Sequence, residues 1–382
     1  MANHRSPGGR LSDNPTPAPA PIRRTPLNSA HRRLGGKMVA FGGWDMPVEY
    51  SGILPEHRAV RERAGLFDVS HMGELSIQGP QALDLVQHVT SNDASKLHLD
   101  QAQYSGLMTA EGTFVDDLLV HKFTDRHYWL VVNASNCDKD FEYICQQNRF
   151  DAQVVNLSDD FTQLALQGPA ALKILQPLTP VALAPIKYYW FTTGKVMGVD
   201  CIISRTGYTG EDGFELYFDP AHAERVWYGL LEAGQDEGIL PCGLGARNTL
   251  RLDAGMALYG HEIDDTTTPL EAGLGWITKL SKPEFLGKHV IERQAAAGLM
   301  RKLVGFEMLE LGIARDGYSV LHQGQPVGHV TSGGPAPSLA KNIGMAYVPV
   351  ALSELGHRLD IQIRTRSVPA QIISLPFYKR AR

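Results

Sequence analysis

Apolar residues along this chain recur with two spacings, one typical of helices and one typical of strands. An apolar stripe with helical spacing directly follows Gly79-Pro80, and proline fits the first position of a helix. The stripe consists of Ala82, Leu83, Val86 and Val89. A second helix is predicted over Ala221–Gly234, with Val226, Leu230 and Leu231 facing inward. Short β-branched or aromatic runs between turn residues predict strands at Tyr128–Asn133, Thr162–Gln167, Val199–Ser204 and Phe214–Phe218.

The combination of a strand end, a Gly-Pro turn and a helix occurs twice. Residues 77–90 and 166–179 start 89 positions apart, and 7 of their 14 aligned residues are identical. A repeated unit of this kind predicts two similar α+β subdomains.

The last part of the chain has a different pattern. Helical periodicity fades after about Gly298, and short strand-like runs take its place. These runs are Lys302–Met308, Ser319–His322, Pro326–Thr331, Ile343–Val348, Arg358–Ile363 and Gln371–Leu375. Short strands at turn-rich spacing are typical of a small barrel or sandwich. The expected fold is therefore α+β first and all-β last.

Composition and charge limit the possible partners. A chain of 382 residues, 43% of them hydrophobic, can form two or three domains that each bury a core. The net charge is −5, and residues 1–24 carry +3 within a proline-rich segment that we expect to be a disordered tail. The remaining −8 argues against a nucleic-acid-binding body, and no apolar run is long enough to cross a membrane.

Cysteine and histidine patterns support neither a disulfide framework nor a metal site. The four cysteines form no CxxC pair, which indicates reduced thiols in a cytosolic protein. The histidines form no HExxH motif, and residues 261–265 (HEIDD) are interpreted as a solvated acidic turn. No nucleophile elbow or cysteine nucleophile signature supports acyl-enzyme chemistry.

Two adjacent acids interrupt the apolar strand predicted at residues 114–121. Alternation places Asp117 on one face with Val115 and Leu119, and Asp116 on the opposite face. Because both faces are otherwise apolar, at least one carboxylate must be hydrogen-bonded, paired or used in chemistry. A structural aspartate bound to a nearby backbone amide is the alternative.

Two further segments carry candidate binding groups. Glu215 lies between apolar neighbours after a glycine-rich loop, and its two oxygens could accept parallel donors from a pterin or guanine edge. A hairpin with a surface glutamate is the alternative. Arg247 lies near the start of a predicted helix, where the helix dipole opposes a cation, so a specific anionic or carbonyl partner is indicated. An ordinary surface arginine would fit the same pattern.

The motifs together resemble one known family. They are residues 36–47 (GKMVAFGGWDMP), residues 65–73 (GLFDVSHMG), the Asp116-Asp117 strand, the loop from Gly207 to Glu215, and residues 331–334 (TSGG). In this order they resemble the aminomethyltransferases, the T-proteins of the glycine cleavage system. The resemblance runs from about residue 25 to residue 379.

The resemblance implies three domains around a central tetrahydrofolate site, the third being a small β-barrel. We expect a tail at 1–24, a folate-binding region of two α+β subdomains at 25–285, and a linker with the barrel at 286–382. The implied reaction moves the methylene carbon of the aminomethyl group on the lipoyl H-protein to tetrahydrofolate. The products are 5,10-methylenetetrahydrofolate, ammonia and dihydrolipoyl H-protein.

The resemblance also implies cellular context. Glycine decarboxylase (P-protein) and dihydrolipoyl dehydrogenase are expected as functional partners beside the H-protein. The expected location is the cytoplasm, or the mitochondrial matrix in a eukaryote. Tetrahydrofolate is expected as co-substrate, with no metal.

Carried over residue by residue, the resemblance assigns roles to single positions. The catalytic aspartate falls on Asp117, the pterin-binding glutamate on Glu215 and the binding arginine on Arg247. Further folate-binding positions fall on Met72, Tyr104, Asn133 and Trp276, with Tyr378 as a C-terminal candidate. The chain departs from the family at His121, which is often tyrosine there.

Two other functions belong to the same superfamily. A folate-dependent demethylase usually carries a flavin or dehydrogenase module, and no dinucleotide fingerprint occurs here. A non-catalytic folate-binding relative typically carries a Lys-Gly-Cys-type motif, which this chain lacks. The complete set of Asp117, Glu215 and Arg247 favours the transferase.

Overall fold

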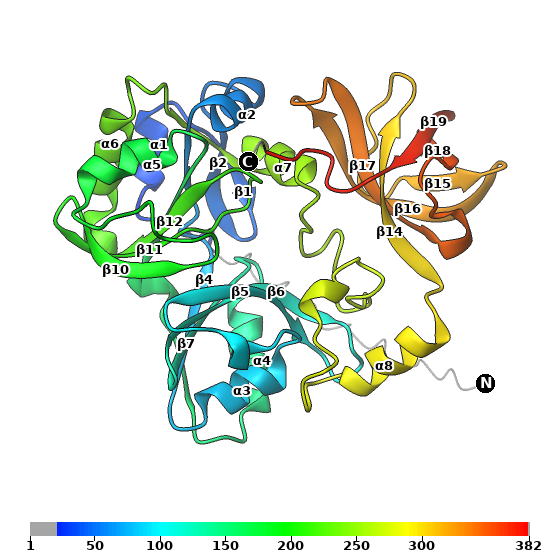
Figure 1. Cartoon of the computed structure of the whole chain (residues 1–382). Coiled ribbons are helices and arrows are strands. Elements are labelled where there is room, and N and C mark those ends of the chain that lie inside the picture. The colour runs from blue at the N-terminus through cyan, green and yellow to red at the C-terminus, as the bar shows by residue number, and fades with distance from the viewer. Residues whose placement is uncertain (1–20, 381–382) are drawn as a thin grey trace, which may run out of the picture.

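The computed structural model describes residues 21–380, which form three lobes around a common centre (Figure 1). The first lobe contains a six-stranded sheet with the order β10-β11-β12-β9-β3-β13. Its strands are β3 (Gly65–Asp68), β9 (Thr162–Gln167), β10 (Phe191–Val196), β11 (Val199–Ser204), β12 (Gly213–Phe218) and β13 (Leu240–Pro241). Its helices are α1 (Asn28–Arg33), α2 (Ile53–Glu62), α5 (Ala171–Leu175), α6 (Ala223–Ala233) and α7 (Leu244–Asp253).

The second lobe contains a five-stranded sheet with the order β5-β6-β7-β4-β8. Its strands are β4 (Gly73–Gln78), β5 (Gln101–Met108), β6 (Phe114–Thr124), β7 (His127–Val132) and β8 (Gln153–Asn156). Helices α3 (Ala82–Val89) and α4 (Cys137–Gln147) cover one face, because their apolar residues share a core with that face of the sheet.

The third lobe is a closed barrel with the order β14-β17-β16-β15-β18-β19. Its strands are β14 (Arg301–Met308), β15 (Ser319–His322), β16 (Gln325–Ala336), β17 (Lys341–Pro349), β18 (Arg358–Ile363) and β19 (Arg366–Ile373). Helix α8 (Lys288–Ala297) precedes it, and a hairpin of β1 (Lys37–Phe41) and β2 (Trp44–Glu49) lies beside the first lobe (Figure 1). Short 3-10 turns are Ala94–Lys96, Ser158–Asp160, Gln176–Leu178, Pro220–His222, Gly275–Ile277 and Val350–Leu352.

The two α+β lobes share one topology, which confirms the predicted repeat. In each, a strand leads through a Gly-Pro turn into a helix and then into a three-stranded meander that returns to pair with the first strand. The two glycines, Gly79 and Gly168, have φ of 140° and 125°, a conformation that residues with a Cβ rarely adopt. A Cβ on Gly168 would lie 2.6 Å from the Arg63 carbonyl oxygen. The turn sequence is therefore required by backbone geometry in both lobes.

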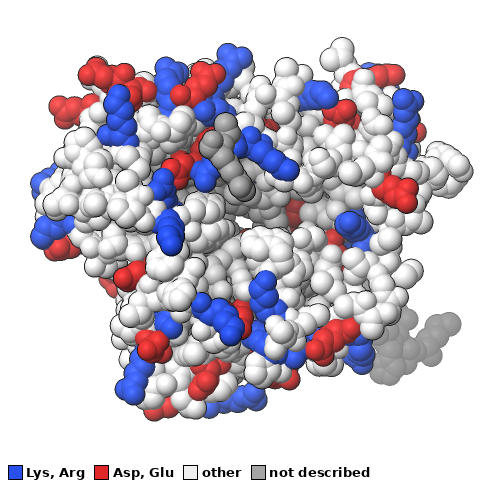
Figure 2. Space-filling view, viewed as in Figure 1, with Lys and Arg blue, Asp and Glu red and all other residues white. Residues whose placement is uncertain are grey.

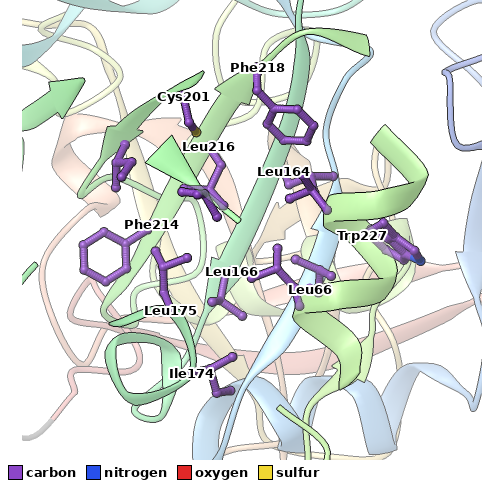
Figure 3. Close-up of a cluster of buried hydrophobic side chains, with 14 of the residues drawn as sticks. Leu66, Leu164, Leu166, Ile174, Leu175, Cys201, Phe214, Leu216, Phe218 and Trp227 are labelled. Atoms are coloured by element: carbon purple, nitrogen blue, oxygen red, sulfur yellow. The ribbon is translucent and has the colours of Figure 1, made fainter. Parts of the chain in front are cut away.

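The core of the first lobe lies between its sheet and the helices α5 and α6 (Figure 3), and Ala30 of α1 packs into it as well. Alternate residues Phe214, Leu216 and Phe218 of β12 point into it, together with Leu164 and Leu166 of β9. The residues between them on these strands point to the opposite face, toward the second lobe. This alternation supplies the polar side chains of the candidate site.

Most predicted elements are confirmed, but the barrel strands β14, β16, β17 and β19 are each longer than predicted. The helix stripe at 82–89 and the strands at 162–167, 199–204, 319–322 and 358–363 have the predicted limits. Strand β16 continues to Ala336 because its glycine-rich end still pairs with β17. Strand β19 begins at Arg366, since the polar start of the strand pairs with the end of β18. Barrel closure extends both strands beyond their apolar residues.

One predicted side-chain placement is wrong. Val115 does not share the face of Asp117, because a bulge in the β5–β6 ladder leaves it without an opposite residue. Val115 packs instead in the core with Leu118 and Val120. Leu119 keeps the predicted face and, like Asp117, lines the central cavity.

The predicted tail ends in residues that belong to the fold. Residues 1–20 lie outside the described part of the chain, but the backbone N–H of Arg23 donates to Gly43 and its carbonyl accepts from Asp45. The limits at 24/25 and 285/286 stay predictions. None of the helices within residues 21–380 is long and apolar enough to span a membrane, and the four cysteines are free thiols.

Candidate active site

A cavity of about 850 Å³ lies where the three lobes meet. Figure 2 shows the surface hollowed at this point, with mostly uncharged residues around the opening. Of the sequence-predicted site residues, Met72, Tyr104, Asp117, Asn133, Glu215, Arg247 and Trp276 line it. The volume falls within the range of small-molecule sites. The fold thus brings together seven of the eight predicted positions.

Asp117 places its carboxyl group on the cavity wall formed by β6. The Tyr104 hydroxyl donates to Oδ2 over 2.7 Å, and the Asn133 side-chain amide donates to Oδ1 over 2.7 Å. Burial, followed by the charge of Asp116, raises the pKa of Asp117 to about 7. Asp117 can therefore exchange a proton near neutral pH.

Asp116 points away from the cavity and is fully buried. Its carboxylate accepts from the Asn133 backbone N–H at 3.0 Å and from the side-chain amides of Asn133 and Asn136, both at 2.8 Å. The two interpretations of the acid pair therefore apply to different residues: Asp116 is the backbone-bonded aspartate, and Asp117 is the half-buried residue whose carboxyl group lines the cavity.

Glu215 lies on β12, opposite the wall that carries Asp117. It is 9% exposed, so the interpretation as a surface glutamate is wrong. The Thr206 hydroxyl donates to Oε2, and the Gln163 amide donates to Oε1 over 3.2 Å. Burial raises the pKa of Glu215, opposed by these donors and by the charge of Arg247. Both carboxylate oxygens thus lie within a polar pocket of an otherwise apolar wall.

Arg247 begins the second turn of α7 and faces the same cavity. Its guanidinium lies over the Tyr208 ring at 4.5 Å from the centroid. Burial lowers the pKa of Arg247, while electrostatic interactions with the Tyr208 hydroxyl and with the charge of Glu215 oppose that change. Arg247 is a cavity residue rather than an ordinary surface arginine.

Trp276 and Met72 define the edges of the cavity. Trp276 is 58% exposed and lies 5.9 Å from the Tyr104 ring, so it marks the opening. Met72 packs against apolar clusters of the first lobe and of the space between the two sheets. The deep end is polar and the opening is aromatic.

Tyr378 is the predicted site residue that does not line the cavity. Its ring lies 3.9 Å from the Arg61 guanidinium carbon, and its N–H donates to the Asp253 carbonyl over 2.8 Å. The neighbouring Leu375 and Pro376 do line the cavity. Tyr378 therefore lies where the C-terminal segment crosses from the barrel to the first lobe (Figure 1).

Sequence reasoning missed Gln163 and Tyr208. Gln163 donates to Glu215, and its Oε1 is buried without a hydrogen-bond partner among residues 21–380. The alternation of Leu164 and Leu166 with Gln163 was the available signal, because it leaves polar side chains on the face opposite the core. Tyr208 lies in the glycine-rich loop, where no helix or strand periodicity indicates which way its side chain points.

His121, the departure from the family pattern, lies between the two sheets. It is 1% exposed, and its Nε2 lies 3.1 Å from the Ser204 hydroxyl. Burial lowers its pKa to about 3, so the imidazole is neutral at physiological pH.

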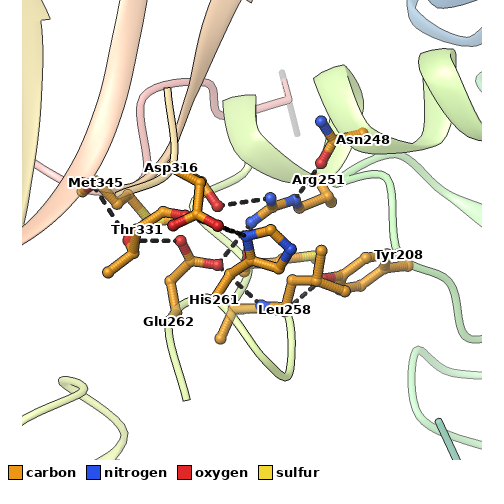
Figure 4. Close-up of polar contacts among 12 residues, drawn as sticks. Tyr208, Asn248, Arg251, Leu258, His261, Glu262, Asp316, Thr331 and Met345 are labelled. Carbon is orange, nitrogen blue, oxygen red and sulfur yellow. Dashed lines mark hydrogen bonds and ion pairs between the residues drawn. The ribbon is translucent and has the colours of Figure 1, made fainter. Parts of the chain in front are cut away.

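The prediction of a solvated acidic turn at 261–265 is wrong for Glu262. Glu262 is fully buried and forms an ion pair with Arg251 at 2.8 Å, while Thr331 of the barrel donates to its other oxygen (Figure 4). His261 lies 3.4 Å from Asp316 of the barrel. The turn is an interface between α7 and the barrel, and the charge of Glu262 is compensated there.

Comparison with known proteins decides the family. Residues 27–282 match the family described as the GCVT N-terminal domain, and residues 301–379 match the glycine cleavage T-protein C-terminal barrel domain. The chain belongs to the glycine cleavage T-protein family. This membership confirms the resemblance found in the sequence and the barrel as a family domain.

Individual T-protein relatives are similar over nearly the whole chain. The aminomethyltransferase of Acidobacterium capsulatum is 55% identical over 371 residues, covering 96% of this chain and 98% of the relative. The aminomethyltransferase of Desulfitobacterium hafniense is 52% identical over 360 residues, which cover 94% of this chain and 99% of the relative. The crystal structure of the glycine cleavage system aminomethyltransferase T from Bartonella henselae has a TM-score of 0.89 at 33% sequence identity. The match covers 94% of this chain and 98% of that one.

Proposed function

We propose that this T-protein family member transfers the methylene carbon of the aminomethyl group on the lipoyl H-protein to tetrahydrofolate. The products are 5,10-methylenetetrahydrofolate, ammonia and dihydrolipoyl H-protein. The observation that carries the proposal is the pair of buried carboxyl groups, Asp117 and Glu215, on the two sheet walls of one cavity in a chain of this family.

The deep end of the cavity has the chemistry to hold a pterin ring. Glu215 offers two acceptor oxygens to the adjacent N–H groups of an aminopyrimidinone edge. Arg247 is a donor for a ring carbonyl, and Gln163 Oε1, which has no hydrogen-bond partner within residues 21–380, is a further acceptor. The opening at Trp276 then leaves room for the tail of the folate.

Asp117 supplies proton exchange and negative charge at the reacting carbon. A group with a pKa near 7 can protonate a leaving nitrogen and afterwards, as a carboxylate, stabilise the cationic carbon. Tyr104 and Asn133 fix its two oxygens, so the group is oriented before substrate arrives. The three lobes exclude water, which would otherwise capture the reactive carbon.

The proposed partners follow from this reaction. The lipoyl H-protein delivers the aminomethyl group, and glycine decarboxylase and dihydrolipoyl dehydrogenase act before and after this step on the same carrier. The proposed site of action is the cytoplasm. A folate-dependent demethylase or a non-catalytic folate-binding protein is the competing function.

The test is ammonia release from aminomethylated lipoyl H-protein with and without tetrahydrofolate. We expect folate-stimulated release in the wild type. Asp117→Asn should retain folate binding while kcat falls about 10²–10⁴-fold, the range for a positioned acid–base group. Folate binding without folate-stimulated release would favour the non-catalytic function. Near-normal turnover of Asp117→Asn would remove Asp117 from the reaction.

A further inference from the structure

Asp116, Asp117 and Asp140 form a cluster of buried acids behind the cavity wall. The side-chain nitrogen of Asn133 lies 2.8 Å from Asp116 Oδ1 and 2.7 Å from Asp117 Oδ1, so a single amide bridges two carboxyl groups. Asp116 and Asp140 are fully buried, and neither lines the cavity. Three buried carboxyl groups this close together cannot all be ionised, because neighbouring negative charges repel one another.

Hydrogen bonds show which acid carries the charge. Asp116 accepts three N–H bonds from Asn133 and Asn136, and a carboxylate that accepts several N–H donors is favoured in its ionised form. Asp140, in the first turn of α4, keeps its proton: burial and the charge of Asp116 raise its pKa to about 11, against the opposing charge of Lys139, whose Nζ lies 4.0 Å from Asp140 Oδ1. The cluster thus contains a fixed anion at Asp116 and a neutral acid at Asp140.

Other groups facing Asp117 act in different directions. Tyr104 on β5 donates a hydrogen bond to its ionised form, and Arg247 across the cavity attracts it. Tyr208, beside Arg247, is neutral because burial raises its pKa. Asp116 is therefore the nearby anion that opposes ionisation of Asp117.

We propose that Asp116 is a positioning residue of the reaction: its fixed charge, joined to Asp117 through the Asn133 amide, keeps on Asp117 the proton that the leaving nitrogen takes. This inference rests on the proposed transfer to tetrahydrofolate. Mutual repulsion of neighbouring carboxylates is the physical cause, and the three N–H donors to Asp116 determine which partner remains protonated.

Every proton and electron pair in the proposed reaction has a donor and an acceptor. The O–H bond of Asp117 breaks as its proton moves to the aminomethyl nitrogen, and the C–N electron pair leaves with ammonia. A folate nitrogen then forms a bond to the carbon and returns its N–H proton to Asp117. As the second folate nitrogen bonds to the carbon, the C–S electron pair stays on sulfur, which takes the second N–H proton. No oxidant or reductant is needed.

The experiment measures the pH dependence of single-turnover ammonia release with saturating tetrahydrofolate. Release that needs a protonated Asp117 falls as pH rises through its pKa. In Asp116→Asn this fall should move to lower pH by about 1–3 units, the size expected for a neighbouring charge. Release at pH 7.5 should drop roughly tenfold or more and recover only as pH falls through the lowered pKa, at about pH 4–6.

Asp140→Asn is the matched control. It exchanges a buried acid for an amide in the same cluster but removes no charge, since Asp140 is neutral, so its pH profile should coincide with that of the wild type. An unchanged profile in Asp116→Asn, or an equal displacement in Asp140→Asn, would overturn the assignment of the charge to Asp116. Absence of folate-stimulated release in the wild type would instead count against the proposed function.

A measurement on the unmodified protein covers the case in which Asp116→Asn does not fold. Infrared difference spectra of the wild type should show a carboxyl C=O band that appears as pH falls, with a midpoint near 7, and that is missing in Asp117→Asn. If no carboxyl group of the folded wild type titrates between about pH 6 and 8, the proposed role of Asp116 is wrong.

Discussion

Asp117 and Glu215 are buried carboxyl groups with similar hydrogen-bond donors but neighbours of opposite charge, and this difference supports the proposal of chemistry for Asp117 and binding for Glu215. Burial raises the pKa of both. Asp117 lies beside another carboxylate and accepts from a hydroxyl and an amide, which suits proton exchange. Glu215 lies within the field of Arg247 and offers both oxygens to donors, which suits recognition of a ring edge.

The first residue-scale prediction concerns binding. Glu215→Gln should weaken tetrahydrofolate binding roughly 10–100-fold, because it replaces one acceptor oxygen by an N–H donor and removes a charge-assisted bond. Calorimetry measures the dissociation constant. Glu74→Gln is the control: Glu74 is a buried neighbour of Glu215 that does not line the cavity, and burial raises its pKa well above normal. An unchanged constant for Glu215→Gln would disprove the pterin contact.

The second residue-scale prediction concerns pH and His121. The folded-state pKa of about 3 lies below the unfolded value of about 6.5, so the unfolded state binds more protons between these limits and stability falls as pH decreases through them. From pH 7.5 to 5 the loss is about 2 kcal/mol. Because phenylalanine does not bind a proton, His121→Phe should remove this loss of stability at low pH.

Urea unfolding at pH 7.5 and pH 5 checks this expectation. The stability of His121→Phe relative to the wild type should improve by about 2 kcal/mol on going to the lower pH. The comparison uses the change with pH, so any loss of the hydrogen bond to Ser204 affects both conditions equally. Equal relative stability at the two pH values would show that His121 is not held neutral.

At the scale of elements, features that depend on neighbouring residues could be predicted from the sequence. Features that depend on contacts with distant parts of the chain could not. The Gly-Pro turns are visible in the sequence because backbone geometry at Gly79 and Gly168 requires them. The bulge that displaces Val115 depends on pairing with a distant strand, and the burial of Glu262 depends on Arg251 and the barrel. Neither contact leaves a periodic signal in the sequence.

Most residues of the candidate site were also predicted from the sequence, and seven of the eight predicted positions line the cavity. Asp117 and Glu215 interrupt apolar strands, which a sequence shows directly, and the resemblance supplied Tyr104 and Asn133. Gln163 was missed because a polar residue on a half-buried strand is ordinary until the second sheet is known to face it.

The element-scale prediction concerns the repeated turn. Gly168→Ala should lower the free energy of unfolding by about 2–5 kcal/mol, combining an unfavourable φ with the clash against the Val60 and Arg63 carbonyls. The control is Gly298→Ala: its φ is also positive, but no atom lies within 4 Å of the new Cβ, so only about 1–2 kcal/mol is expected. Urea unfolding followed by tryptophan fluorescence measures both. Equal losses would show that the turn is not crowded.

At the scale of the whole molecule, the C-terminal segment joins the barrel to the first lobe. Leu375 and Pro376 line the cavity, and Tyr378 then lies on Arg61 of α2. Arg61 is itself held by Glu211 at 2.9 Å. A cavity enclosed by three lobes depends on such contacts between them, because no single lobe surrounds the cavity.

The last prediction separates two roles for Tyr378. If Tyr378 acts by holding the C-terminal segment against Arg61, Tyr378→Ala should weaken tetrahydrofolate binding several-fold, in line with about 0.5–2 kcal/mol for a cation–π contact. Tyr378→Phe keeps the ring on Arg61 and loses only the hydroxyl, which interacts with Glu211 rather than lining the cavity, so it should bind folate nearly like the wild type. The resemblance implied instead a direct folate contact by this tyrosine, in which case loss of the hydroxyl alone would weaken binding as much as loss of the ring. Calorimetric titration of the three proteins therefore decides between enclosure and contact.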